Sequence, residues 1–207
     1  MKKNTLFWII LLVVTILFAI WTINKIRIAS ILSSAHTSQA KWNEESKSQL
    51  ENYNLRQLYG NKYEELINQK KYNKAVDLCL NEIKRNPKDK GYTYIDIGQV
   101  YNTQEKYDSA IYYYNLAIYF NSLNAKAYAS RGWTYNLLNI DDKAQKDLYT
   151  AAYLDNNYLF SLGIIQEKAK QYDAAIKTYK KQLEIHPDFK DCQDALNELI
   201  EKKKNGL

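Results

Sequence analysis

Two hydrophobic patterns divide this chain of 207 residues. Residues 6–23 form an apolar run without a charged side chain. From residue 56 onward, apolar residues recur at helical spacing within short segments, and polar turns separate these segments. Apolar positions three and four residues apart share one face of a helix. With only 6 Gly and 2 Pro in the chain, the pattern predicts an all-α protein.

A short phrase repeats within the second pattern. It reads Tyr-Asp-Ser-Ala-Ile at residues 107–111 and Tyr-Asp-Ala-Ala-Ile at residues 172–176, with looser copies at 72–76 and 141–145. The alanines of the four copies are spaced 35, 34 and 31 residues apart. Self-similarity at such a period indicates a repeat architecture. We therefore expect four helical hairpins and a final helix; their ranges are 56–89, 91–124, 125–155, 156–189 and 190–207.

The hairpins resemble the tetratricopeptide repeat (TPR), a helix–turn–helix unit with a small and aromatic signature. The second repeat offers this signature as Tyr94, Ile97, Gly98 and Tyr101. The resemblance implies an α-solenoid of four TPR-like hairpins, closed by a capping helix with an apolar stripe. In such a solenoid, glycines of the first helix and alanines of the second allow close packing, and tyrosines fill the space between hairpins.

Several positions depart from the TPR pattern. Tyr63 of repeat one stands where the motif has a small residue, and Asp141 replaces an aromatic residue before a second helix. In repeat three, Arg131 occupies the leucine position of the motif. Repeat three is three residues short. We therefore expect a tight turn at residues 155–158, in place of the usual loop between hairpins.

The resemblance also implies a concave groove that is lined by residues of the first helices. Its apolar and aromatic members suggest a scaffold or adaptor that binds a partly apolar peptide or helix of a partner protein. The expected groove residues are Tyr92, Ile95, Gln99, Lys126, Trp133, Leu137, Phe160 and Ile164. One alternative is that the chain's own connector or the third–fourth junction covers part of this patch. Another is a structural role, as a self-associating homo-oligomer or a regulatory subunit of a membrane complex.

Some TPR domains clamp a carboxyl-terminal carboxylate with Lys, Asn and Arg side chains. The corresponding places in the first three repeats hold Gly60, Glu64, Asp96, Lys126 and Ser130. Only Lys126 matches, and the two acids would repel a carboxylate. We therefore do not expect a clamp of that kind.

The apolar run at residues 6–23 would extend roughly 27 Å as a helix, enough to cross a bilayer core. Trp8 and Trp21 lie near its ends, as interfacial residues do. This predicts a signal anchor after a polar tail at 1–5, with residues 24–55 as a stalk or tether; cleavage after Ser33-Ser34-Ala35 is the alternative. The expected location is a bacterial inner membrane with the repeats outside the cytoplasm, although flanking charges leave the orientation open. Lipid and membrane-associated or envelope proteins are then the expected partners.

Composition excludes other functions. The net charge of +6 is spread over mixed-sign helices, so no nucleic-acid partner is expected. His36 and His186 belong to no catalytic motif, and a phosphate-binding glycine loop is missing from the sequence. We expect no enzyme activity, no cofactor and no metal site. Cys79 and Cys192 are expected to be buried free thiols.

Overall fold

The computed structural model describes residues 2–205, without the side chains of residues 2–14, 16, 17, 19 and 20. Within this range the chain forms nine α-helices and one 3₁₀ turn, and no strand. The helices of the first two hairpins are α1 (Lys2–Asn68), α2 (Tyr72–Arg85), α3 (Lys90–Thr103) and α4 (Tyr107–Phe120). Those that follow are α5 (Ala125–Leu137), α6 (Asp141–Leu154), η1 (Asn156–Tyr158), α7 (Leu159–Lys168), α8 (Tyr172–Ile185) and α9 (Lys190–Lys204).

The chain divides into two units, Met1–Leu58 and Tyr59–Leu207. The first unit consists of α1 without its last turns. Residues 24–55, which were expected to be a stalk or a tether, are helical throughout and almost entirely exposed.

The membrane prediction needs correction. Among the described residues, no helix carries an apolar stretch that could traverse a bilayer. Most side chains of residues 6–23 lie outside the described part of the chain. On this finding, the predicted single-pass membrane location is wrong. The predicted contact with lipid and the choice of membrane or envelope partners depended on the same segment and lose their support.

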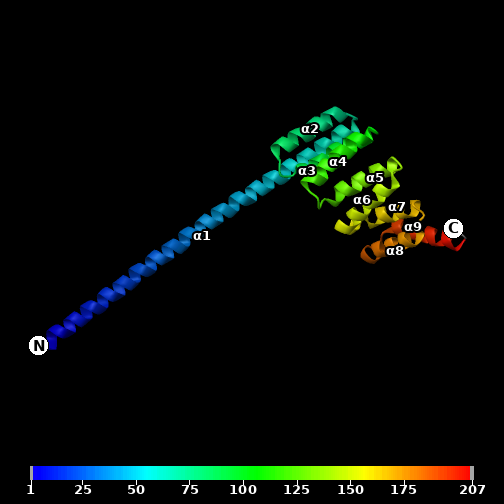
Figure 1. Ribbon diagram of the computed structural model, residues 1–207. Coiled ribbons are helices and arrows are strands. Elements are labelled where there is room, and N and C mark those ends of the chain that lie inside the picture. The colour runs from blue at the N-terminus through cyan, green and yellow to red at the C-terminus, as the bar shows by residue number, and fades with distance from the viewer. Residues whose placement is uncertain (1, 206–207) are drawn as a thin grey trace. The chain divides into compact units, whose positions relative to one another are not determined.

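The second unit is a stack of four hairpins and a final helix, as the repeat spacing predicts (Figure 1). The last turns of α1 share a core with α2 and α3, in which Leu66, Ala75 and Val100 are buried. The pairs α3–α4, α5–α6 and α7–α8 form the other hairpins, and each second helix contacts the first helix of the next hairpin. Helix α9 packs on α8 and closes the stack.

Each hairpin turns at a residue with left-handed backbone. These residues are Lys70, Glu105, Asn139 and Lys170, with φ between 54° and 59°. They repeat at the spacing of the alanines. The next residue's N–H donates to a carbonyl near the end of the first helix, at N···O distances of 2.8 to 2.9 Å in all four turns. This is the hydrogen bond of a Schellman closure, so the first and second helices are joined in the same way in every hairpin.

The connection between the third and fourth hairpins is a tight turn, as predicted. It contains a 3₁₀ turn, Asn156–Tyr158, and the side chain of Asp155 accepts a hydrogen bond from the backbone N–H of Asn157 at 2.9 Å. Helix α7 has 10 residues, against 14 in α3 and 13 in α5. Four residues separate α6 from α7, as they separate α4 from α5, so the missing residues come from the start of α7.

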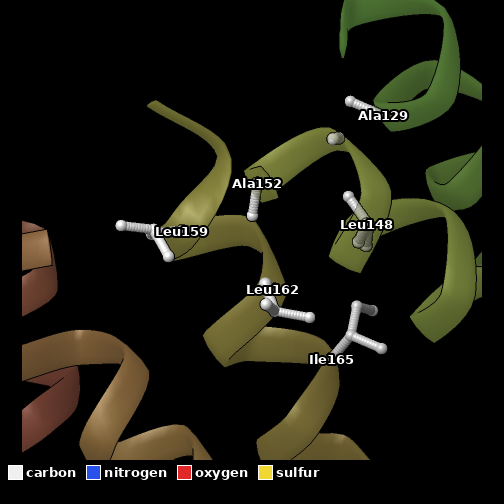
Figure 2. Close-up of a cluster of buried hydrophobic side chains, with 7 residues drawn as sticks. Ala129, Leu148, Ala152, Leu159, Leu162 and Ile165 are labelled. Atoms are coloured by element: carbon white, nitrogen blue, oxygen red, sulfur yellow. The ribbon is translucent and has the colours of Figure 1, made fainter. Parts of the chain in front are cut away.

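Apolar side chains from adjacent hairpins meet across this short connection. Figure 2 shows Leu148 of α6 facing Leu162 and Ile165 of α7, with Ala129 of α5 at the edge of the cluster. All four side chains are buried. Because the cluster joins two hairpins, neither hairpin can bury its apolar face alone, which is the general basis of stability in repeat proteins.

Candidate functional site

The first helices of successive hairpins lie side by side and are connected by polar contacts. Tyr63 Oη donates to the backbone oxygen of Asp96 at 3.0 Å, which joins α1 to α3. Thr134 Oγ1 donates to Asn102 Oδ1 at 3.0 Å and joins α5 to α3. Lys168 Nζ donates to Asn136 Oδ1 at 2.8 Å and joins α7 to α5. We call the surface formed by these helices the first-helix face.

The predicted groove residues differ widely in accessibility. Tyr92 is 55% exposed, Leu137 is 52% exposed and Lys126 is also accessible. Four others are partly buried, namely Gln99, Trp133, Phe160 and Ile164. Ile95 is 1% exposed and packs among Ala110, Tyr114 and Ala127. Ile95 is therefore a core residue, and the accessible apolar surface depends mainly on Tyr92 and Leu137.

Two of the predicted anchors are occupied by contacts within the chain. Trp133 packs against the buried cluster that joins the third and fourth hairpins. The ring of Phe160 lies 4.9 Å from that of Phe189 and 5.8 Å from that of Tyr179, measured between centroids. The contact of Trp133 favours the alternative in which part of the patch packs at the third–fourth junction, whereas Phe160 packs against α8 and the turn before α9. Truncating Trp133 would therefore change stability as well as any binding.

Two hollows open on the first-helix face. One, of about 530 Å³, lies between the end of α1 and α3 and is lined by Tyr63, Glu64, Ile67, Gln99 and Asn102, among others. The other, of about 520 Å³, is lined by Ile164, Glu167, Lys168, Tyr172 and Lys202. Gln99 and Ile164 were expected from the sequence. The contribution of Lys202 was missed, because α9 belongs to no repeat and its pairing with Glu167 (Nζ–Oε1 3.5 Å) follows only from the fold.

The carboxylate of Asp96 lies between α1 and α3 and accepts a hydrogen bond from Tyr59 Oη at 2.8 Å. Burial raises the pKa of Asp96, and the hydrogen bond from Tyr59 and the charge of Lys126 partly oppose this shift. Tyr59 Oη is also 3.2 Å from the sulfur of Cys79. Burial raises the pKa of the Cys79 thiol to about 12, so that the thiol stays protonated. Cys79 and Cys192 are both buried and free, as predicted.

The raised pKa of Asp96 predicts a pH effect on stability. An unfolded Asp titrates near pH 4, so the native state binds an extra proton between that pH and its own, higher pKa. Stability from this group is then lost as pH rises through that interval. We expect Asp96→Asn to raise the melting temperature at neutral pH, and this gain to shrink toward zero near pH 3.5.

Melting curves of both proteins between about pH 3.5 and 7.5 measure this difference. The matched control is Asp194→Asn, which removes an exposed carboxylate from α9. A gain from Asp96→Asn that is constant over this range would contradict the assignment.

Two segments of the chain match the profile of a known repeat. Residues 92–122 and 159–193 each match a sequence profile described as tetratricopeptide repeat. The chain is 30% identical over 102 residues to Hsp70-Hsp90 organizing protein 1 of Glycine max, which covers 48% of this chain and 18% of that protein. It is 29% identical over 108 residues to Hsp70-Hsp90 organizing protein 2 of Arabidopsis thaliana, and this match covers 51% of this chain and 19% of that protein. The chain thus spans less than a fifth of the length of these relatives.

Solved structures share the fold. MamA superposes with a TM-score of 0.58 at 19% identity, over 69% of this chain and 84% of that one. A thermophilic TPR protein of Thermus thermophilus superposes with a TM-score of 0.57 at 20% identity, over 67% of this chain and 77% of that one. The first TPR of Spaghetti, bound to the HSP90 peptide SRMEEVD, superposes with a TM-score of 0.52 at 21% identity, over 55% of this chain and 93% of that one. Residues 92–122 and 159–193 are therefore tetratricopeptide repeats, set in an all-α solenoid of the TPR type.

Proposed function

We propose that the second unit is a protein-binding module that holds a partly apolar peptide or amphipathic helix of a partner on the first-helix face. One observation carries the proposal: this face exposes large apolar side chains, Tyr92 and Leu137, and is hollowed beside Gln99 and Ile164. Exposed apolar patches mark interaction sites, and an aromatic ring is a common anchor of binding energy. Amphipathic helices bind grooves of this kind through their apolar faces.

The relatives support a role in protein binding. Hsp70-Hsp90 organizing proteins act, by name, on two other proteins, and the Spaghetti domain holds a peptide. That peptide, SRMEEVD, carries three acidic residues. Here Glu64 lines one hollow and the carboxylate of Asp96 lies between α1 and α3. Because like charges repel, we propose that this chain selects a partner segment other than an acidic carboxyl-terminal peptide.

Leu137→Ser tests the proposal. Peptides are first selected from a random library on the full chain, and their affinities are then measured by titration calorimetry. We expect Leu137→Ser to weaken binding about tenfold, the loss of roughly 1.4 kcal/mol expected for a moderate anchor. Because Leu137 is half exposed, the melting temperature should change little.

Leu80→Ser is the matched control, since Leu80 is an exposed leucine on the second helix α2. It should leave peptide affinity unchanged. Equal affinities for wild type and Leu137→Ser would contradict binding on the first-helix face. The peptide SRMEEVD serves as a further comparison, and we expect it to bind no better than a scrambled version.

A further inference from the structure

A third hollow, which none of the predicted groove residues lines, lies at the turn between α8 and α9. Its volume is about 500 Å³. It is lined by Gln182 and Ile185 of α8, by His186, Asp188 and Phe189 of the turn, and by Asn157 of η1.

Gln182 is the unusual residue of this hollow. It is 2% exposed, and its Oε1 atom is buried without a hydrogen-bond partner among the described residues. The equivalent positions of the second and third hairpins, seven residues after the repeat alanine, hold Ala117 and Ala151, both fully buried. The fourth hairpin therefore places an amide where the second and third hairpins have only a methyl group; the first hairpin has Glu82 there, which pairs with Arg85. A buried acceptor without a donor is costly, so packing does not explain the glutamine.

The residues around Gln182 indicate which functional group a ligand of this hollow would carry. The unpartnered oxygen requires an N–H or O–H donor. Because the terminal torsion of a glutamine amide is broad, rotation of the amide can present this oxygen to the hollow that Gln182 lines. Asp188 adds a solvent-exposed carboxylate. Ile185 and the ring of Phe189 add apolar wall. A guanidinium group suits this combination, since it is planar, carries five donors and a positive charge, and stacks on aromatic rings.

We propose that this hollow binds the guanidinium group of an arginine side chain that a partner protein presents. The guanidinium donates to Gln182 Oε1 and to the carboxylate of Asp188, while its plane and aliphatic stem lie on Phe189 and Ile185. A lysine ammonium fits less well, because it is strongly hydrated and has no plane to stack. The site shares no lining residue with the two hollows of the first-helix face and can be tested separately from them.

A titration of the full chain with N-acetyl-arginine amide, followed by NMR of the backbone and side-chain amides, tests the proposal. We expect saturable shifts at Gln182 and in residues 185–189, with a dissociation constant on the order of 1 mM, as suits so small a ligand. N-acetyl-citrulline amide has nearly the same shape without the charge and should bind about tenfold more weakly. Equal binding of the two, or shifts that do not saturate, would overturn the proposal.

Two variants complete the test. Gln182→Met keeps the volume and removes the amide; we expect about tenfold weaker binding of N-acetyl-arginine amide and a melting temperature that does not fall. A lower melting temperature would show that the amide serves packing, and would count against the proposal. Asp188→Asn should also weaken binding. Glu184→Gln is its matched control, since Glu184 is an exposed carboxylate of α8 outside the hollow, and it should bind as wild type does.

Discussion

Gly163→Ala is expected to destabilise the protein by about 3 kcal/mol, the upper end of the usual cost of overpacking. A Cβ at this position would lie 2.6 Å from Cδ1 of Tyr179 and still closer to Cε1 of the same ring. Tyr179 is completely buried between α7 and α9, so its ring has no room to withdraw. In a domain of this size the melting temperature should fall by roughly 10 °C. Urea unfolding followed by circular dichroism measures the free energy directly.

Two other glycines serve as controls for this substitution. No atom lies within 4 Å of a Cβ on Gly60, which is inside helix α1. Gly60→Ala should therefore gain about 0.5 to 1 kcal/mol from helix propensity. A Cβ on Gly132 would lie 3.0 Å from Cγ of Leu148, so Gly132→Ala should cost less than Gly163→Ala. If Gly163→Ala is as stable as Gly60→Ala, the fourth hairpin does not pack in the register described.

Arg131→Leu is the second substitution with a large expected effect, although it restores the residue that the TPR motif prefers. Arg131 holds the carboxylate of Asp147 with two hydrogen bonds, Nε–Oδ2 at 2.7 Å and Nη2–Oδ1 at 2.8 Å. The side chain of Asp147 is only 7% exposed. Removing one member of a buried ion pair leaves an uncompensated charge and costs about 3 to 5 kcal/mol. Chemical denaturation of the variant measures this loss.

The residues that correspond to Arg131 and Asp147 in two other hairpins show how the lost stability could be restored. They are Ile97 with Tyr113 in the second hairpin and Leu162 with Thr178 in the fourth, neither of which is an ion pair. We therefore expect the double variant Arg131→Leu/Asp147→Thr to recover most of the stability, because no buried charge remains. A double-mutant cycle tests the coupling. Losses that simply add would show that Asp147 does not depend on Arg131.

The fold was predictable from sequence because the repeat alanines and glycines occupy close contacts. Ala110, Ala144 and Ala175 recur at nearly constant spacing, and each is completely buried. The shortening of the third repeat was also predictable, since its alanine is followed by the next one after 31 residues instead of 34. The pairing of Arg131 with Asp147 could not be predicted from sequence. Arg131 was visible as a departure from the motif, but its partner lies 16 residues away on the facing helix.

The accessibility of the candidate groove residues was less predictable than the fold. Motif positions mark side chains that face the groove in an average repeat, and among these Tyr92 and Leu137 are exposed. Phe160 is partly buried instead, because Phe189 of the turn before α9 packs on its ring. That turn lies outside the repeat pattern, so no repeat position could reveal the contact. The sequence also showed Gln182 at the position that holds Ala117 and Ala151 in the preceding hairpins. That its side-chain oxygen is buried without a partner became evident only from the structure.

The four left-handed turns have a mechanical consequence. Because Lys70, Glu105, Asn139 and Lys170 close their hairpins with the same backbone geometry, the joint inside each hairpin is stiff and standardised. The joints between hairpins each span four residues but differ in conformation, and only the one between α6 and α7 contains a 3₁₀ turn, Asn156–Tyr158. Strain applied to the second unit would therefore be taken up between hairpins, where insertions or deletions can reset curvature without altering the units themselves.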